Sequence, residues 1–385
     1  MFRKFLLILI QLSNKPLSLK EQTTFFFMKL KPVLQVFGGL AIVLTLLPLI
    51  AIDYWWIRIF DFPHIQLTIL TFTALITYFM RFEIKRVEDY IFAIGILCCF
   101  IFQLTKIYPY TPFADFEVLE AKNNNPEKTI SLYTANVYQK NKEKQKLIQD
   151  IKKHDADILL FVETNTSWKE NIDTNISEDY KYDVSVPLDN TYGMLLYSKL
   201  KLIEPEVKYL VDKGIPSIHT QVLLNSGDTI QLYTIHPTPP MPQHNPKSSD
   251  RDAEMMKIAN LSRKSKYPVL VIGDFNDVAW SATTSLFYNV AELLDVRKGR
   301  GFYNTFDAKS FIMRWPLDHI FISSEFRAID ISLGSDINSD HFPTYTKLSF
   351  EPENAAEQQP KKPTQDQLER AKEQANGVQK VELDM

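Results

Sequence analysis

Polar motifs that follow apolar runs constrain the fold of this chain more than any other feature. In chain order they are Thr134-Ala-Asn136, Phe161-Val-Glu163-Thr164, Ile235-His236-Pro237, Gly273-Asp-Phe-Asn-Asp277 and Ser339-Asp-His-Phe-Pro343, with Leu317-Asp-His-Ile320 ahead of the last. Four of them end β-branched or apolar runs, at Ile130–Val137, Ile158–Val162, Ile230–Ile235 and Pro268–Ile272. Strand ends are where a rigid scaffold directs polar side chains toward one point. The sequence therefore predicts a convergence of carboxylates, carboxamides and imidazoles, which suits a divalent metal held by oxygens, with histidines left for proton transfer and phosphate contact.

The order of these motifs resembles the endonuclease/exonuclease/phosphatase superfamily of metal-dependent phosphoesterases. The resemblance covers about Lys128 to Phe350, and Gly-Asp-Phe-Asn followed by Ser-Asp-His is its most specific part. Shorter segments resemble a bacterial membrane-anchored branch: His236–Pro240, Arg251-Asp252, Trp280-Ser281 and Arg300-Gly301-Phe302. The resemblance implies an α+β fold, a four-layer α/β/β/α sandwich of the deoxyribonuclease type, here preceded by three transmembrane helices. Periodicity alone predicts only strands that alternate with helices at Lys142–Lys153 and Asp250–Ser265.

The expected metal ligands are Glu163, Asn136 and Asp340. Glu163 ends an apolar strand, where a lone charge would otherwise be structural or capping, and a hard cation such as Mg²⁺ is typically held by one or two carboxylates. By resemblance Asn136 lies beside it and also contacts the phosphate, whereas the alternative for Asn136 is a turn residue at a strand end. The implied cofactor is Mg²⁺ or Mn²⁺.

The expected catalytic residues are His236, Asp274, Asn276, Asp318 and His341. Asp274 and Asn276 stand two apart, so in an extended chain both can address one phosphate. By resemblance Asp274 orients or deprotonates the attacking water, Asn276 binds phosphate or transition-state oxygen, and Asp318 holds His341. His236 is a candidate acid for the leaving oxygen or a phosphate ligand.

Three polar features are interpreted as structural. His319 alternates away from Asp318 on one strand, so a role in the site is not expected. Surface salt bridges are the favoured interpretation of Arg251 and Arg300, with substrate contact as the alternative. The lysines between Lys140 and Lys153 are interpreted as a solvated helix face.

Three apolar stretches precede the catalytic region: Val33–Ile52, Phe62–Met80 and Tyr90–Thr105, the last extending to Tyr110. Crossing the hydrocarbon core takes about 20 apolar residues, and three such stretches in series favour membrane spans over buried core helices. Lysine and arginine before the first span and in the second loop place the N-terminus in the cytoplasm and residues beyond about 110 outside. The prediction is a multi-pass protein of a bacterial inner membrane with a periplasmic or extracellular catalytic domain. The only two cysteines, Cys98 and Cys99, lie in the third stretch, which leaves the catalytic region free of thiols.

The expected organisation has five parts. These are an extension at 1–27, which a start at Met28 would exclude, a membrane anchor at 28–110, a linker at 111–127, the catalytic domain at 128–350 and a polar tail at 351–385, disordered or marginally helical.

The predicted function is metal-dependent hydrolysis of phosphodiesters or phosphomonoesters by in-line attack of water. The substrate is a lipid, a small phosphoester or a nucleic acid, and no protein partner is implied. A net charge of −3 gives no support to a polyanion binder, so an extracytoplasmic nuclease is the second choice. A catalytically silent binding module on the same fold is the alternative from another class.

Overall fold

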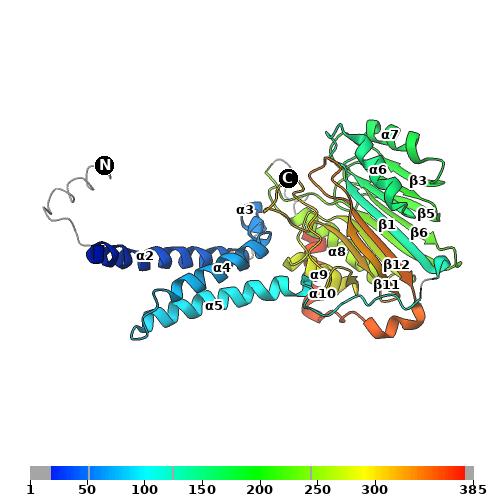
Figure 1. The fold of residues 1–385 in the computed structure, drawn as a ribbon. Coiled ribbons are helices and arrows are strands. Elements are labelled where there is room, and N and C mark those ends of the chain that lie inside the picture. The colour runs from blue at the N-terminus through cyan, green and yellow to red at the C-terminus, as the bar shows by residue number, and fades with distance from the viewer. Residues whose placement is uncertain (1–18, 51–52, 124, 243–244, 378–385) are drawn as a thin grey trace. The chain divides into compact units, whose positions relative to one another are not determined.

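The computed structural model describes residues 19–50, 53–123, 125–242 and 245–377 (Figure 1). Its contacts divide the chain into two compact units. A helical unit comprises residues up to Leu49 together with His64–Leu104, and a sandwich unit comprises Ile50–Pro63 and the chain from Thr105 onward. Most of the expected extension, residues 1–18, lies outside the described residues.

The helical unit contains α2 (Leu19–Leu46), α4 (His64–Phe79) and α5 (Val87–Ile107). Asp89 joins all three at one end, because its carboxylate lies 2.6 Å from Lys31 Nζ and accepts a 2.9 Å hydrogen bond from Tyr78 OH. At the other end Gln103 Nε2 donates to Thr45 Oγ1 over 3.2 Å. The middle of α2, the end of α4 and the start of α5 therefore lie together, and the helices alternate in direction.

The helical unit exposes apolar side chains that a soluble bundle would bury. Val36 is 74% exposed and Ile91 67%. Leu30–Leu49 and Val87–Tyr110 are long and apolar enough to cross a membrane, and a third span is complete only if the bent pair Trp55–Asp61 and His64–Phe79 counts as one. The second expected span is thus shorter than predicted, because α4 covers only His64–Phe79.

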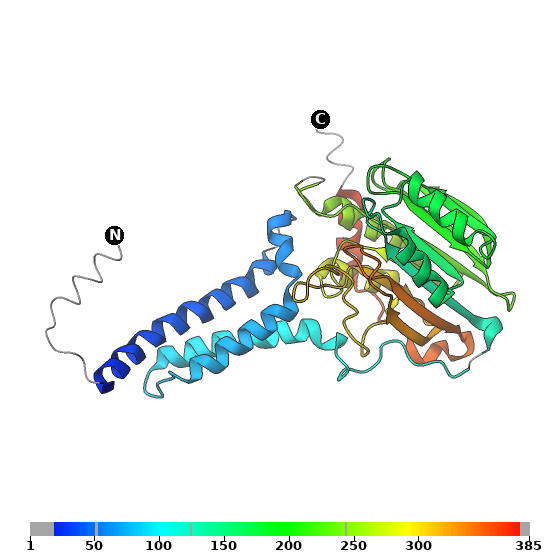
Figure 2. The ribbon, with the colours of Figure 1, turned by 45° about the horizontal axis from the view of Figure 1, so that its top comes forward.

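The sandwich unit is built on two six-stranded sheets (Figure 2). The first has the order β11 (Phe326–Leu333), β12 (Thr344–Phe350), β1 (Thr129–Asn136), β2 (Ile158–Val162), β4 (Met194–Ser198) and β3 (Tyr182–Val186). The second has the order β5 (Lys201–Lys208), β6 (Ser217–Leu223), β7 (Thr229–Ile235), β8 (Val269–Asp274), β10 (Asp318–Ile322) and β9 (Leu294–Asp295). The strands and helices predicted from periodicity are present with ends shifted by a few residues.

Side-chain alternation along the strands produces four layers. On β1, Ile130 and Leu132 enter the core between the sheets, while Tyr133 and Ala135 face the opposite way. That outer face is covered by α6 (Lys144–His154) and α7 (Thr166–Ile176). The second sheet is covered by α8 (Ser249–Arg263), α9 (Ala282–Ala291) and α10 (Gln365–Asn376). The expected α+β architecture with two packed sheets is therefore present.

Strand register brings the polar motifs to one edge of the sandwich. β1 and β2 are parallel, with Asn136 opposite Val162, and β7 and β8 are parallel, with Ile235 opposite Gly273. β10 runs antiparallel to β8 and sets Asp318 opposite Asp274. Gly273 has a φ of +149°, and a Cβ there would lie 1.9 Å from Ile235 O, so only glycine allows β7 and β8 to approach this closely.

Two segments expected to belong elsewhere pack onto the sandwich. Residues 53–61, placed in the anchor by the sequence, contribute α3 (Trp55–Arg58), and Trp55 N donates to Pro246 O over 2.8 Å. The expected linker 111–127 is not free either, since Ala121 N donates to Ala328 O over 2.9 Å and Val118 is fully buried. Part of the anchor and the linker predicted from composition therefore pack on the sandwich unit.

The tail from 351 was expected to be disordered or marginally helical, and much of the segment 352–376 is helical. A 3-10 helix covers Pro352–Gln358, and α10 begins with a capping box in which Thr364 and Gln367 satisfy each other's backbone amides. Ala371 is buried against α8 and α9, with Leu368 and Ala375 beside it. One narrow apolar face is enough to dock an otherwise polar helix. Residues 378–385 lie outside the described part of the chain.

Candidate active site

Asp274 is the centre of the site. It ends β8, is 1% exposed, and its Oδ1 accepts a 3.0 Å hydrogen bond from Asn276 N. Its Oδ2 accepts a 3.1 Å bond from Asn136 Nδ2 and lies 3.6 Å from His341 Nε2 and 3.9 Å from His236 Nε2. One carboxylate thus brings together four other residues that the motifs predicted.

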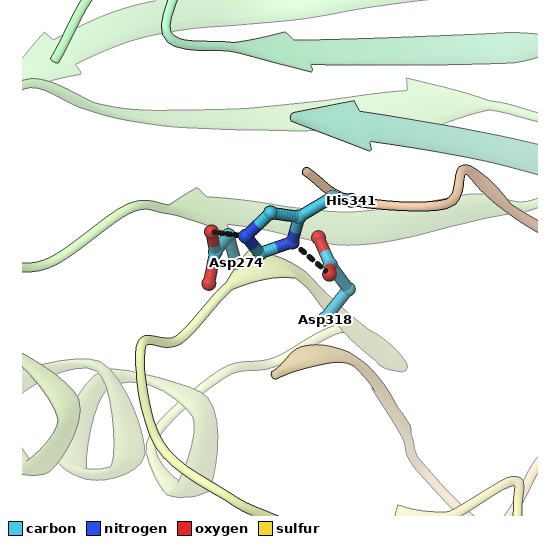
Figure 3. Close-up of side chains that lie close together, drawn as sticks. All are labelled: Asp274, Asp318 and His341. Atoms are coloured by element: carbon cyan, nitrogen blue, oxygen red, sulfur yellow. Dashed lines mark hydrogen bonds and ion pairs between the residues drawn. The ribbon is translucent and has the colours of Figure 1, made fainter. Parts of the chain in front are cut away.

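His341 lies between two carboxylates (Figure 3). Its Nδ1 is 2.8 Å from Asp318 Oδ2, and its Nε2 faces Asp274. Burial alone would lower the pKa of His341, but the charges of Asp318 and Asp274 outweigh burial and raise that pKa to about 10. His341 is therefore an imidazolium at neutral pH, with Nδ1–H donating to Asp318. The structure places this pair as the sequence analysis expected.

Asp274, Asp318 and His341 also satisfy a simple geometric criterion for a metal site, because one ligand atom from each lies within 4.8 Å of the others. A metal-binding imidazole is neutral, whereas the charges of Asp318 and Asp274 raise the pKa of His341. The geometry of these three residues therefore fits a metal site as well as a hydrogen-bonded Asp-His-Asp array.

Asn136 directs its amide nitrogen, not its oxygen, at the carboxylates. Nδ2 donates to Glu163 Oε1 over 2.9 Å and to Asp274 Oδ2 over 3.1 Å, while Oδ1 accepts a 3.0 Å bond from Tyr138 N. Only the nitrogen can donate to two carboxylates, so this orientation follows from the partners. In this orientation Asn136 links Glu163 to Asp274, and its role as a metal ligand stays a prediction.

Glu163 and Asp340 have the chemistry of a cation site. Burial raises the pKa of Glu163 and the charge of Asp340 raises it further, whereas His236 and the Asn136 hydrogen bond lower it. Among the described residues, no lysine or arginine forms an ion pair with either carboxylate. Two neighbouring carboxylates, one of them largely buried, fit a hard divalent cation.

His236 and Asn276 complete the predicted set. His236 follows β7, is 2% exposed, and its ring centroid lies 5.5 Å from that of Tyr192. Asn276 has a φ of +51°, and its Nδ2 donates to Pro237 O over 3.0 Å. The His236 and Asn276 loops are therefore tied to each other at the edge where β7 and β8 end.

Ser339 connects the loop between β11 and β12 to the neighbouring strand β1 of the same sheet, and no role was predicted for it. Its Oγ donates to Asn136 O over 2.7 Å and accepts a 3.1 Å bond from His341 N. The signal was present, since Ser339 opens the Ser-Asp-His motif, but its partner could not be read from the sequence. Ser339 fixes the His341 loop to the end of β1.

The interpretation of Arg251 as a surface residue is wrong. Arg251 is 2% exposed, and its guanidinium lies 2.9 Å from Asp252 Oδ1 and 3.3 Å from Asp277 Oδ1. It also donates to the backbone oxygen of Asn276 over 2.9 Å. The buried guanidinium of Arg251 thus stabilises the loop that contains Asn276 and Asp277.

Arg300 and His319 both have structural contacts. The Arg300 guanidinium lies 4.2 Å from the Phe116 ring centroid, which is a cation–π contact rather than the expected salt bridge. His319 accepts from Arg297 Nη2 over 2.6 Å and donates to Asp277 O over 2.8 Å. Burial and Arg297 hold the pKa of His319 well below its ordinary value, which agrees with its expected structural role.

Replacing Arg251 should destabilise the sandwich unit strongly. Arg251→Ala would leave Asp252 and Asp277 buried without their cation, which costs about 3–5 kcal/mol. Thermal unfolding of the full-length protein in detergent checks this. The matched control is Arg263→Ala, an exposed arginine on the same helix, which should melt like the wild type. Equal melting of the two variants would contradict the structural role of Arg251.

The site combines a buried Asp-His-Asp array with a pair of carboxylates, at one edge of two packed sheets. This combination is typical of metal-dependent phosphoester hydrolases. The sequence matches the model of the Endonuclease/Exonuclease/phosphatase family over residues 133–341, which is more than half of the chain. The chain belongs to this family. Members of the family hydrolyse phosphoesters and generally depend on divalent metals.

Several solved structures are similar to this chain. A humanised D. rerio TDP2 is 16% identical over 58% of this chain and 99% of its own, with a TM-score of 0.48. A family member from Bacteroides thetaiotaomicron is 18% identical over 58% and 98%, with a TM-score of 0.47. The catalytic domain of human Nocturnin is 17% identical over 62% and 97%, with a TM-score of 0.48. No curated protein sequence matches the chain.

Proposed function

We propose that this protein is a membrane-anchored, metal-dependent phosphoesterase that hydrolyses its substrate by in-line attack of water on phosphorus. The observation that carries the proposal is the His341 ring, held with Nδ1 2.8 Å from Asp318 and Nε2 3.6 Å from Asp274. A buried cationic donor next to a carboxylate that can accept a proton is suited to a substrate whose charge increases in the transition state.

The residues of the site have different roles in this reaction. Asp274, with Oδ1 held by Asn276 N, orients the attacking water through Oδ2 and accepts its proton. His341 donates Nε2–H toward a phosphoryl oxygen, and Asp318 maintains its charge and tautomer. His236, whose Nε2 lies 3.9 Å from Asp274 Oδ2, protonates the leaving oxygen or binds the phosphate. No covalent intermediate on the protein is required.

Glu163 and Asp340 are the residues that hold the divalent cation, Mg²⁺ or Mn²⁺ being the ions that carboxylates favour. When bound, the cation neutralises negative charge on the phosphoryl group as a Lewis acid. Asn136 contributes by holding Glu163 through its amide nitrogen.

Three membrane spans with the catalytic domain outside the cytoplasm remain our proposal for topology, as in the bacterial membrane-anchored branch. Residues 53–63 and the chain from Thr105 onward belong to one compact unit, so both lie on one side of a bilayer and α4 alone (His64–Phe79) makes the second crossing. Three alternating helices satisfy that requirement, with Lys31 and Asp89 at the opposite, cytoplasmic end. The protein is then a multi-pass component of the inner membrane.

Reporter fusions test this topology. Alkaline phosphatase fused after Tyr110 should be active, because that enzyme folds only after export, whereas the same reporter fused at Arg86 should be inactive. A cytoplasmic reporter such as green fluorescent protein should give the opposite pattern. Activity of alkaline phosphatase at Arg86 but not at Tyr110 would overturn the orientation.

Turnover of bis(4-nitrophenyl) phosphate by the purified full-length protein tests the proposed reaction. Release of nitrophenol should stop when EDTA removes divalent metal and return when Mg²⁺ or Mn²⁺ is added. Absence of turnover with every divalent metal would favour a catalytically silent binding module. Nicking of a supercoiled plasmid would favour the extracytoplasmic nuclease, for which the net charge of −3 provides no general attraction.

A further inference from the structure

The chain from Phe306 to Trp315 forms a closed loop with an apolar tip. Phe306 N donates to Trp315 O over 3.0 Å at its base, and Arg314 Nη2 donates to Ala308 O over 3.1 Å within it. The tip, Phe311-Ile312-Met313, is 92%, 69% and 48% exposed along its three residues. The loop is thus shaped by its own hydrogen bonds while three consecutive apolar side chains face solvent. Contiguous exposed apolar surface marks an interaction site.

This loop is continuous with the active site. The Phe306 and His341 rings lie 5.1 Å apart between centroids, and the two residues form an antiparallel bridge. Ala308 N donates to Asp340 O over 2.7 Å, next to the candidate metal ligand. The loop therefore lies at the edge of the candidate active site, and whatever binds the tip is brought close to that site.

The base of the loop also packs on the segment that leads into α4. The Phe62 ring meets the Trp315 ring edge-on, with centroids 5.6 Å apart, and Trp280 Nε1 donates to Asp61 O over 2.9 Å. Phe62 is only two residues from His64, where α4 begins. If α4 enters a bilayer, residues 61–63 lie at its boundary, and the loop packed against them lies there as well.

The tip is flanked by positive charge. Lys309 is exposed and Arg314 half-buried, on either side of Phe311–Met313. Lys309 Nζ also lies 5.0 Å from the ring centroid of Tyr138, whose backbone N–H donates to Asn136 Oδ1. Apolar side chains between basic residues are the combination that binds at an anionic lipid interface.

We propose that the tip Phe311–Met313 inserts into the lipid surface and that the substrate is the phosphoester of a membrane phospholipid, held with its headgroup in the site. This inference rests on the proposed function and names its substrate class. A bilayer explains three observations together: the exposed apolar tip, its basic flanks and its packing against the start of a candidate span. Nucleic acid would use the basic flanks but would account for neither the apolar tip nor its packing against the start of a candidate span.

Insertion is tested without relying on turnover. In a Cys98→Ser, Cys99→Ser background, Phe311→Cys is labelled with an environment-sensitive fluorophore and the full-length protein is reconstituted into phosphatidylcholine–phosphatidylglycerol vesicles. Nitroxide-bearing lipids should quench the label strongly. Tyr267→Cys is the matched control, because Tyr267 is 41% exposed and precedes β8, whose far end carries Asp274 about 20 Å away. Equal quenching at the two positions, or none at 311, overturns insertion.

Substrate class is tested on the same protein with three probes: phosphatidylglycerol in mixed micelles, bis(4-nitrophenyl) phosphate and supercoiled plasmid. Phe311→Ser combined with Met313→Ser should lower kcat/KM on the lipid about tenfold more than on the soluble diester, because the tip no longer gains apolar burial. Tyr267→Ser should preserve both rates. Equal losses on the two probes, or plasmid nicking without lipid hydrolysis, overturns the phospholipid assignment. If no probe is hydrolysed the proposed function fails, while the quenching result still decides whether the tip inserts.

Discussion

His341→Ala should lower kcat on a diester by about 10³-fold, because the phosphoryl group loses its cationic donor. The imidazolium is buried and held between Asp318 and Asp274, so no water or neighbouring side chain of equal charge replaces it. Initial rates of the full-length protein in detergent measure the effect. His154→Ala is the control, since His154 ends α6, away from the strand ends of the site, and this variant should keep wild-type turnover.

A double-mutant cycle shows whether Asp318 acts through His341. Asp318→Asn retains a side chain of the same shape but no longer stabilises the imidazolium, so its loss should be smaller than that of His341→Ala. The double variant should be about as slow as His341→Ala alone, because both changes remove one interaction. Circular dichroism of each variant confirms folding. Fully multiplicative losses would mean that the two residues act independently.

Glu163→Gln should abolish most of the stimulation by Mg²⁺ or Mn²⁺. The substitution retains the shape of the side chain and its hydrogen bond with Asn136 but removes the charge that attracts the cation. Mn²⁺ binding followed by electron paramagnetic resonance should weaken by about tenfold or more, since each 1.4 kcal/mol of lost binding energy is a factor of ten. Metal titrations of turnover should shift in parallel.

The control for this variant is Glu170→Gln, which neutralises an exposed glutamate on α7. It should bind Mn²⁺ and respond to Mg²⁺ like the wild type. If Glu163→Gln behaves in the same way as this control, Glu163 is not a ligand and the cation site must lie elsewhere.

The part of the site that could be predicted from the sequence is the part encoded by contiguous motifs. Asn136, Glu163, His236 and Asp274 each follow an apolar run, and parallel pairing of β1 with β2 and of β7 with β8 places such residues at one edge. The pairing of Asp318 with His341 came from the family resemblance, and the structure has it at 2.8 Å. Short-range periodicity and motif order were sufficient for these elements.

What could not be predicted depends on contacts between distant segments. Arg251 lies on a helix whose polar residues look solvated, yet its partner Asp277 is 26 positions away and both are buried. Similarly, nothing in the composition of residues 53–61 indicates that Trp280 will bond to Asp61. The direction of the Asn136 amide is set by Tyr138 N and by two carboxylates at once, which a motif cannot encode.

The tail sequence contains signals for a helix, although its polar composition favours disorder. Thr364 and Gln367 have the spacing of a capping box, and Leu368, Ala371 and Ala375 recur at helical intervals. The abundance of Glu, Gln and Lys favoured disorder because it leaves little apolar surface to bury. Docking against α8 and α9 supplies the stabilisation that the isolated segment lacks.

The stereochemistry at phosphorus tests the central claim most directly. We expect full-length protein supplied with Mg²⁺ to hydrolyse a chiral phosphorothioate diester in ¹⁸O-labelled water with inversion of configuration, because a single in-line displacement by water, oriented by Asp274, inverts the centre once. Retention of configuration would require two displacements through a covalent intermediate on the protein, and it would contradict the assignment of Asp274, Asp318 and His341 made here.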